Sequence, residues 1–472
     1  MSGLAAAFAD IATYADRWLG FRQRYLRIPG VQAAVWSDGD LVLSTAHGHA
    51  DVATDVALTP GHLFRVASHS KTFTATAVVK LAEEGKLRLD DRLDAHLPWT
   101  AATGVGDRQL ADLLGHTGGV MRDGRDADHW QLARPFPDDD AFRALVADVG
   151  VRPADERFKY SNLAFGLLGA VIAAVSGRTY REYLAAEIVA PLGLSDTAPD
   201  LLPDRLGDYA LGYSALAYAD HRVPIEHVDT GALDAATGFT STAADLVRWG
   251  AAHLPDDEWL LGATFQRRMR RPSFDVDVHD SDAGRYGLGF DLREVHGHRA
   301  FGHGGGYPGH STRLTVVPEE RLAVAVCTNA IDGAALGLVN GLVALAVLAA
   351  GEPSGDAVGA EVDRFCGRYA SLWAVVDIVR LGRRLLMINP TGDDPAAAVV
   401  ELEPAGDDTF RVVRTPGYGS FGERLGFTLG STGAVESVQG PGGITLWPID
   451  RMTAFVDSRD DVRLGDLAAG PV

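Results

Sequence analysis

Apolar side chains repeat with helical spacing in several stretches of the chain, most clearly over residues 71–84. Phe73, Ala77 and Leu81 would share one face of that helix, and Gly85 is a residue type that commonly ends a helix. A first helix is expected near the N terminus. The same spacing predicts further helices over residues 109–114, 162–176, 243–253 and 334–349.

Alternation of apolar residues predicts strands between these helices. Val31, Ala33 and Val35 alternate with their neighbours before an Asp38-Gly39 turn, so residues 29–48 are expected to form a hairpin. Short strands are also expected over residues 63–67, 286–293, 299–303, 311–317 and 322–328.

The pattern changes near residue 352. Residues 352–360 contain Pro, Gly and Ser without a periodic pattern, which is typical of a linker. Short strand-like runs follow, separated by turn signals, and predict a small β-barrel or sandwich. We therefore expect one domain over residues 1–351, a linker over 352–362 and a β domain over 363–472. The predicted strands of this last domain are 384–388, 398–403, 410–414, 425–429 and 444–448.

The chain of 472 residues is acidic, with a net charge of −20. A nucleic-acid partner requires clustered Lys and Arg to neutralise phosphates, and an anionic membrane surface also attracts basic segments. Neither partner is expected. Two cysteines, Cys327 and Cys366, exclude a disulfide framework or a thiolate metal site. The N-terminal residues mix charged and apolar positions, unlike a signal peptide, so a cytoplasmic location is the expectation.

Residues 334–351 are almost entirely apolar and nearly long enough to span a bilayer. Gly337, Asn340 and Gly341 interrupt the stretch, and no basic anchor flanks it. A buried helix is therefore the favoured interpretation.

Ser68 and Lys71 form the first candidate reactive pair. They lie one turn apart at the start of the helix predicted over residues 71–84 and form the only Ser-x-x-Lys in a chain with four lysines. A serine hydroxyl needs a base to become a nucleophile, and lysine can be that base if burial lowers its pKa. The alternative is a capping serine beside an exposed lysine.

Tyr160-Ser161-Asn162 is the only Tyr-x-Asn of the chain. A tyrosine hydroxyl can relay a proton to a leaving group, and an asparagine can hydrogen-bond both an ammonium group and a substrate amide. The alternative is that both residues merely begin the helix over residues 162–176.

A glycine run follows His303, at Gly304, Gly305 and Gly306. Glycines allow backbone N–H groups to approach a ligand, as an oxyanion hole requires. A dinucleotide-binding loop is rejected because a strand follows instead of a helix. An α/β-hydrolase oxyanion loop is rejected because the chain has no Gly-x-Ser-x-Gly. Metal binding is disfavoured because no carboxylate has suitable spacing to the candidate ligands His296, His298, His303 and His310.

The motifs Ser-x-x-Lys, Tyr-x-Asn and His-x-Gly, in that order, resemble those of the serine β-lactamase and penicillin-binding-protein superfamily. The likeness is greatest to the branch of class C β-lactamases, D-aminopeptidases, D-amino-acid amidases and esterases, and it covers roughly residues 15–350. It implies an α/β (α+β) fold in which helices flank an antiparallel sheet and form a helical subdomain. Residues 365–369 resemble the start of an appended lipocalin-like β-barrel. Supporting stretches are residues 63–68, 113–119, 238–246 and 286–289.

The resemblance also implies roles for the site residues. Ser68 would be acylated, Lys71 would take its proton, Tyr160 would protonate the leaving group and Asn162 would hold Lys71 and the substrate amide. His303 stands where β-lactamases usually carry lysine. The N–H groups of Ser68 and Gly306, with Gly304 and Gly305 beside them, would bind the oxyanion and substrate. No metal or cofactor is implied.

A histidine in place of that lysine changes the expected chemistry, because a mostly neutral imidazole binds a substrate carboxylate less well than an ammonium group. We therefore expect hydrolysis of an amide or ester in a small molecule or short peptide, with D-configured residues among the candidates. Two alternatives stay open: an acyltransferase or peptide-cyclising thioesterase with the same acyl-enzyme, and a non-catalytic binding or scaffold protein. Assembly into a homo-oligomer is compatible with the sequence.

Overall fold

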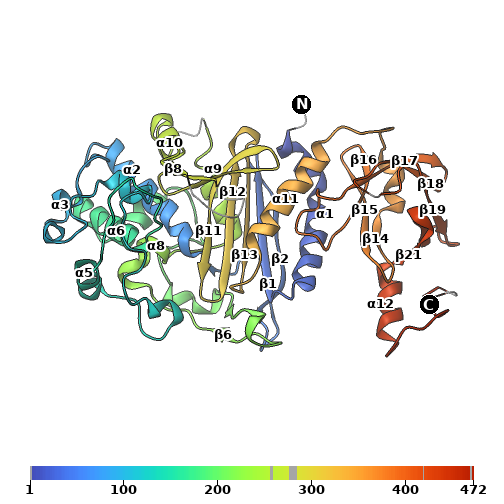
Figure 1. Ribbon diagram of the computed structural model, residues 1–472, viewed down its shortest axis with the longest axis horizontal. Helices are drawn as coiled ribbons and strands as arrows, with labels where there is room; N and C mark the ends of the chain where they lie inside the picture. The colour runs from blue at the N-terminus through green and yellow to red at the C-terminus, as the bar shows by residue number, and fades with distance from the viewer. Residues whose placement is uncertain (1–2, 256–258, 276–283, 418, 468–469, 472) are drawn as a thin grey trace. The chain divides into compact units, whose positions relative to one another are not determined.

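The computed structural model describes all residues except 1–2, 256–258, 276–283, 418, 468–469 and 472. The chain forms two compact units. One is Leu26–Val339, and the other combines Met1–Tyr25 with Asn340–Val472. The N-terminal helix and the part of the helix over residues 335–350 that follows residue 339 therefore belong to the same unit as the C-terminal strands. The domain limits expected from the sequence (1–351, 352–362 and 363–472) remain a prediction. Figure 1 shows the elements of both units.

An antiparallel sheet forms the framework of the Leu26–Val339 unit. Its strands are β1 (Gly30–Ser37), β2 (Asp40–Asp51), β3 (Val56–Ala57), β8 (Phe274–Asp275), β9 (Arg285–Tyr286), β10 (Asp291–Val295), β11 (His298–Tyr307), β12 (His310–Val317) and β13 (Leu322–Thr328). They lie in the order β3-β2-β1-β13-β12-β11-β10-β9-β8. Every residue of β13 is buried, so this strand lies at the centre of the core. The predicted turn between β1 and β2 is present, because Asp38 and Gly39 adopt φ of 46° and 113°.

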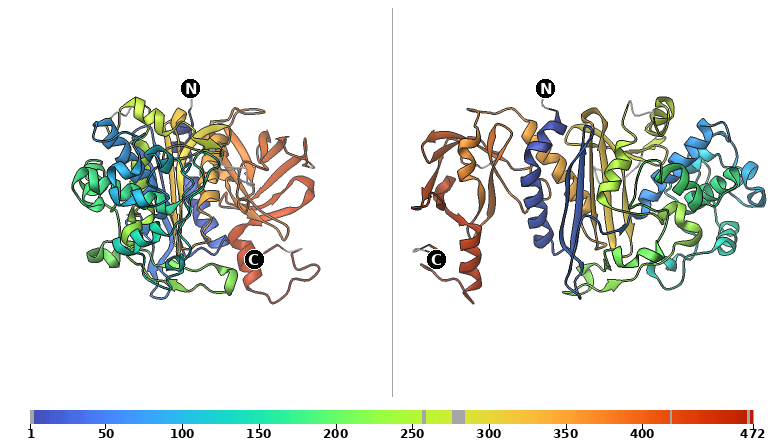
Figure 2. Two further views of the ribbon diagram at one scale, coloured as in Figure 1. Left: turned by 60° about the vertical axis from the view of Figure 1, so that its left-hand side comes forward. Right: turned by 180° about the vertical axis from the view of Figure 1, so that it is seen from behind.

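Helices of the same unit cover the sheet and form the predicted helical subdomain. They are α2 (Ser70–Glu83), α3 (Leu93–His96), α4 (Leu110–Leu114), α5 (Asp139–Ala147), α6 (Asn162–Ser176), α7 (Tyr180–Leu184), α8 (Asp234–Thr237), α9 (Ala243–Ala251) and α10 (Ala263–Met269). Helices α2, α6 and α8 pack together beside the sheet, at the left in Figure 1 and at the right in the rear view of Figure 2. Helix α9 packs on β1 and β13. Because α2 is central, it buries polar as well as apolar side chains.

A three-ring stack fixes α2 in this core. Phe73 on α2 lies between Phe239, with ring centroids 4.1 Å apart, and Trp249 of α9, with ring centroids 3.9 Å apart. All three side chains have no exposed surface. Stacked aromatic rings of this size bury much apolar surface and hold the orientation of their backbones.

The C-terminal strands form a closed antiparallel barrel within the second unit. They are β14 (Gly367–Ala370), β15 (Val375–Leu381), β16 (Arg384–Ile388), β17 (Val400–Gly406), β18 (Thr409–Arg414), β19 (Arg424–Leu429), β20 (Val435–Gln439) and β21 (Thr445–Pro448). Pairing of Tyr369 with Pro448 closes the ring. Val358 and Val362 are buried in the barrel cluster, so part of the segment predicted as a linker packs with the barrel. The predicted barrel is confirmed, although the sequence pattern missed β14, β15 and β20.

Three helices accompany the barrel in this unit: α1 (Leu4–Tyr25), the part of α11 (Ala335–Ala350) that follows residue 339, and α12 (Ile449–Asp457). A Cβ atom at Gly341 would lie 2.3 Å from the Trp18 ring, so a glycine is needed where α11 meets α1. Among the described residues, no single helix is long and apolar enough to cross a membrane, and α11 has only 16 residues. The pair Asn162–Ser176 and Tyr180–Val189 meets the criteria of length and composition only when taken together, across a bend of 76°.

One predicted strand is wrong. Residues 286–293 were expected to be continuous, but residues 287–290 form a loop between β9 and β10. Gly289 adopts φ of 80°, and its N–H donates to the carbonyl of Leu114. A Cβ atom at Gly287 would lie 2.1 Å from the Met269 carbonyl oxygen. Gly287 and Gly289 therefore allow the backbone of this loop to approach neighbouring backbone closely. The alternating pattern of apolar residues alone did not predict this.

Replacing Phe73 with alanine should lower the free energy of unfolding by about 3–5 kcal/mol, because it removes the middle ring of a closed stack. Denaturant titration followed by circular dichroism measures the change. Tyr218→Ala is the control, because Tyr218 is 83% exposed, and it should change stability by less than about 0.5 kcal/mol. Equal effects of the two variants would contradict the central role of the stack.

Candidate active site

Ser68 lies on a short 3-10 helix, η1 (Ala67–His69), between β4 (Phe64–Arg65) and α2. The preceding Ala67 has φ of 50°, a conformation that non-glycine residues rarely adopt. Ser70 holds the turn, since its Oγ donates to the Ala67 carbonyl at 2.6 Å and accepts from the Phe239 N–H at 2.9 Å. Ser68 is half-buried while its neighbours are buried. The strained turn therefore presents one hydroxyl group to solvent.

Lys71 is the second residue of α2 and is completely buried. Its Nζ lies 3.1 Å from Ser68 Oγ, and it donates to Asn162 Oδ1 and to the Ala236 carbonyl, each at 2.8 Å. Burial lowers the pKa of the Lys71 ammonium well below its usual value, Asp123 partly opposes this effect, and Arg122 adds to it. The local environment therefore favours the neutral amine.

The contacts of Lys71 determine where its lone pair points. A neutral amine has two N–H donors and one lone pair. Asn162 Oδ1 and the Ala236 carbonyl oxygen accept hydrogen bonds from these two N–H donors. The remaining neighbour at hydrogen-bonding distance is Ser68 Oγ. In the neutral form of Lys71, the lone pair would therefore be directed at the serine hydroxyl, which is the arrangement that a general base requires.

Tyr160 lies on the other side of the same hydroxyl group. Its O–H donates to Ser68 Oγ at 2.8 Å, and Lys71 Nζ lies 4.7 Å from the centre of its ring. Burial raises the pKa of the Tyr160 phenol well above its usual value. Tyr160 is therefore protonated at neutral pH and can donate a proton, whereas Lys71 can accept one.

Asn162 is the first residue of α6, and the Ser161 hydroxyl caps this helix by accepting from the Ala164 N–H at 3.0 Å. The Asn162 side chain donates through Nδ2 to Asp123 Oδ1 at 2.6 Å while its Oδ1 accepts from Lys71. The structure thus brings Ser68, Lys71, Tyr160 and Asn162 together, and it adds Asp123, which none of the three motifs contains.

His303 lies on β11 with both ring nitrogens in contact with oxygen atoms. Nδ1 is 2.6 Å from the Gly304 carbonyl oxygen, and Nε2 is 3.0 Å from the Tyr286 hydroxyl. A carbonyl can only accept, so Nδ1 carries the proton and Nε2 accepts from Tyr286. Burial lowers the pKa of His303 to about 4. The ring is therefore neutral at pH 7 and offers no cation to a substrate.

The glycine run lies within β11, not in a loop. Pairing with β10 ends at Gly302, so in the described part of the chain residues 303–307 pair with a strand, β12, on one edge only. β11 also packs closely against the segment that contains η1, because a Cβ atom at Gly305 would lie 2.2 Å from the carbonyl oxygen of Val66, the residue before η1. Gly306 is exposed, with open space around its Cα. A free strand edge beside Ser68 suits the predicted oxyanion and substrate contacts of Gly304, Gly305 and Gly306.

Two aromatic residues that no motif singled out, His116 and Tyr286, connect the second and third motifs, since Tyr286 also contacts His303. The His116 ring lies 4.4 Å from the Tyr160 ring and 4.9 Å from the Tyr286 ring. Its Nδ1 accepts from the Ser161 N–H at 3.2 Å, which fixes one tautomer. Both residues lie in sequence stretches that supported the resemblance, at 113–119 and 286–289, but those stretches carried no chemical signal of a role.

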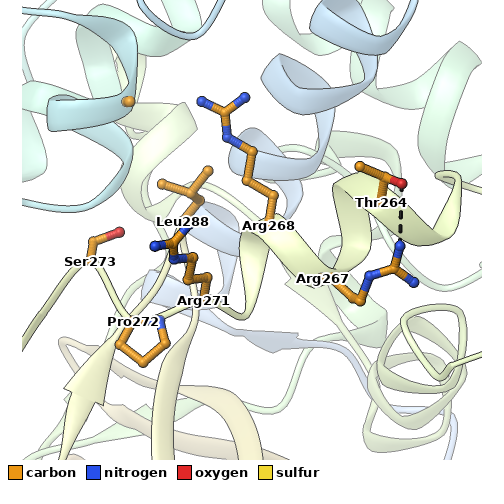
Figure 3. Close-up of a pocket in the computed structure, with 8 residues that line it drawn as sticks. Thr264, Arg267, Arg268, Arg271, Pro272, Ser273 and Leu288 are labelled. Atoms are coloured by element: carbon orange, nitrogen blue, oxygen red, sulfur yellow. Dashed lines mark hydrogen bonds between the residues drawn. The ribbon is translucent and has the colours of Figure 1, made fainter.

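A pocket of about 660 Å³ borders Leu288, on the loop that follows β9. Arg268 and Arg271 lie beside Leu288 there, and Arg267 turns toward Thr264 (Figure 3). Of the described residues, the pocket-lining set does not include Ser68, Lys71 or Tyr160. The described residues also contain no group of three His, Cys, Asp or Glu side chains that could hold a metal ion. The candidate chemistry therefore rests on the motif residues themselves.

A family model described as Beta-lactamase matches residues 18–348. The chain belongs to this family. It is 30% identical over 341 residues to penicillin-binding protein 4 of Amycolatopsis lactamdurans, which covers 68% of this chain and 85% of that relative. Together with the predicted superfamily, this likeness identifies a serine hydrolase of the β-lactamase type.

Solved structures of the family show the same fold. A structure of SurE has a TM-score of 0.61 at 26% identity, over 93% of this chain and 99% of that chain. A second SurE structure, with D-Leu, has a TM-score of 0.54 at 25% identity over the same shares. The D-amino acid amidase of Ochrobactrum anthropi SV3 complexed with D-phenylalanine has a TM-score of 0.61 at 23% identity, over 72% of this chain and 99% of that chain.

Gly305→Ala should destabilise the unit that carries the site, because the added methyl group would collide with the Val66 carbonyl and lie 2.3 Å from Thr312 Oγ1. We expect a loss of about 1–3 kcal/mol in the free energy of unfolding, as in other overpacked sites. Gly306→Ala, at the next residue, meets open space and should leave the melting temperature nearly unchanged. Equal melting temperatures of the two variants would contradict the close approach of β11 to η1.

Proposed function

We propose that the protein hydrolyses an amide or ester bond through an acyl-enzyme on Ser68. The observation that supports this most directly is the position of Ser68 Oγ, 3.1 Å from the Lys71 amine and 2.8 Å from the Tyr160 hydroxyl. Burial favours the neutral form of both partners. One can therefore accept a proton and the other can donate one, at the same pH.

In the proposed acylation, the Ser68 oxygen bonds to the substrate carbonyl carbon while its proton moves to the Lys71 lone pair. The bond from carbon to the leaving nitrogen or oxygen then breaks as Tyr160 protonates the leaving group. Lys71 returns its proton to Tyr160, so both side chains regain their starting forms. Water next attacks the acyl-enzyme with the same groups as base and acid, and it releases the acid product.

The remaining predicted residues would bind and orient the substrate in this scheme. The N–H groups of Ser68 and Gly306 would stabilise the negative charge on the carbonyl oxygen, a contribution that is large in a partly dry site. Asn162 would hold Lys71 and receive the substrate amide. The edge of β11 at Gly304 and Gly305 would lie alongside the acyl group.

The neutral His303 favours amide and ester substrates that do not depend on a carboxylate next to the scissile bond. A fixed ammonium at this position would bind such a carboxylate, whereas an uncharged imidazole whose two nitrogens already have partners would not. The D-amino acids in structures of two relatives, D-Leu with SurE and D-phenylalanine with the amidase, support D-configured residues as part of the substrate. The amidase was also solved with L-phenylalanine, so both configurations belong in a substrate screen.

A fluorophosphonate probe tests the nucleophile and the base. Wild-type protein should be labelled on Ser68, and Ser68→Ala should not be labelled. Lys71→Arg should lose at least about a hundredfold in labelling rate, because arginine stays protonated and cannot accept a proton at neutral pH. Lys80→Arg on the same helix is the matched control, since Lys80 pairs with Glu84 away from the site.

Peptide mass spectrometry locates the label, and intact-mass measurement gives the rates. An unlabelled but folded wild-type protein would favour the non-catalytic scaffold. Near-normal labelling of Lys71→Arg would contradict the role of Lys71 as base.

A product analysis then distinguishes hydrolysis from acyl transfer. The wild-type protein is incubated with L- and D-aminoacyl amides, short-chain esters and β-lactams, with and without an added amine. Free acid as the main product in both conditions supports hydrolysis. A product in which the added amine captures the acyl group in preference to water would support the acyltransferase alternative.

A further inference from the structure

Asp123 lies on the segment between α4 and α5 and contacts Asn162, one of the proposed site residues. Its Oδ1 accepts from Asn162 Nδ2 at 2.6 Å and from Trp130 Nε1 at 3.0 Å. Its Oδ2 lies 3.3 Å from Arg122 Nε, and its side chain is only 13% exposed. A nearly buried carboxylate held by three donors has a fixed position and a charge that neighbouring groups experience strongly.

We propose that Asp123 is a positioning residue, which fixes the orientation of the Asn162 amide and sets the charge around Lys71. This inference rests on the proposed function, because it concerns the base of the same acyl-enzyme reaction. Asp123 lies outside the three motifs, and its effect on the reaction would pass through Asn162 and Lys71.

The first part of the argument concerns the amide of Asn162. An ionised carboxylate can only accept hydrogen bonds, so Asp123 requires the NH₂ group of Asn162 to face it. The amide oxygen then faces Lys71 and takes one of its N–H donors. A flipped amide would direct an N–H group at Lys71 and compete for its lone pair. Asp123 therefore keeps this lone pair available to Ser68.

The second part of the argument concerns charge. The Asp123 anion favours the ammonium form of Lys71 and raises the pKa that burial has lowered, whereas Arg122 acts in the opposite direction. The Arg122 guanidinium lies 5.3 Å from the centre of the Tyr160 ring, on the exposed side of the site. Asp123 and Arg122 are adjacent and opposite in charge, and they therefore shift the pKa of Lys71 in opposite directions.

Three other titratable groups near Lys71, namely His116, His303 and Tyr160, stay uncharged across the neutral range. Burial lowers the pKa of His116 well below its usual value and that of His303 to about 4, and it raises that of Tyr160. Asp234 on the neighbouring α8 does titrate, because burial raises its pKa to about 7, but its carboxylate accepts from Arg181. All four groups are unchanged in the variants compared below.

The experiment measures the rate at which a fluorophosphonate labels Ser68 between pH 5 and 10 in the full-length protein. Labelling requires the neutral amine of Lys71, so the rate falls as pH decreases through the pKa of Lys71. Asp123→Asn removes a negative charge and therefore lowers the pKa of Lys71. The low-pH fall in labelling rate, called the acidic limb below, should move to lower pH by about one unit. Arg122→Gln removes a positive charge and should move the limb to higher pH.

A second variant tests the orientation of Asn162. Asp123→Ala leaves the Asn162 NH₂ group without its acceptor, so the amide can turn. We expect the labelling rate at the high-pH plateau to fall roughly tenfold. Asp126→Asn is the matched control for charge, since Asp126 lies on the same loop, is exposed and pairs with Arg134. It should show the wild-type profile.

The outcomes separate this inference from the proposed function. If wild-type Ser68 is not labelled at any pH, the proposed function fails. If wild-type Ser68 is labelled but Asp123→Asn and Arg122→Gln shift the limb in the same direction, or not at all, the role of Asp123 is contradicted while the proposed function stands. A lower melting temperature without a shifted limb would show that Asp123 has only a structural role.

Discussion

The burial of one amine is the constraint on which the rest of this structure depends. Lys71 has no exposed surface, and it can remain there because two oxygen atoms, from Asn162 and Ala236, accept its N–H donors. Burial removes the charge of an ammonium group at this position from water and lowers the pKa of Lys71 well below its usual value. Burial therefore shifts Lys71 toward the neutral amine, whose lone pair would face Ser68. The same burial that makes α2 a core helix makes Lys71 a candidate base.

The segments that surround this amine and exclude water from it are far apart in the sequence. The 3-10 helix η1 supplies Ser68, α2 supplies Lys71, α6 supplies Asn162 and α8 supplies a carbonyl group, while β11 packs against η1. The stack of Phe73, Phe239 and Trp249 holds α2 against α9, and the glycines of β11 let that strand approach η1. Stability and reactivity thus share the same packing, so core substitutions far from Ser68 affect the site through the position of α2.

The third motif shows how a substitution within a common fold changes the expected substrate. The histidine at position 303 is neutral and has both nitrogens occupied, so it completes a wall of the site without supplying charge. Charge near the reacting hydroxyl comes instead from Asp123 and Arg122, which lie next to each other and oppose one another. If the proposed function holds, this arrangement suits an uncharged amide or ester, and residues outside the three motifs set the pKa of Lys71.

The sequence by itself determined the helices with strong apolar periodicity, such as 162–176, the first hairpin and the reactive pair. These features depend on local spacing, which a single chain displays. The order of the three motifs with their flanking stretches was also enough to predict the fold of the first domain, and the short strand-like runs near the C terminus predicted the barrel. Only the tertiary structure decided that residues 287–290 leave the sheet, that the glycine run lies within β11, and that Asp123 reaches Asn162. Each of these depends on a contact between segments distant in sequence, and neither periodicity nor motif spacing records such contacts.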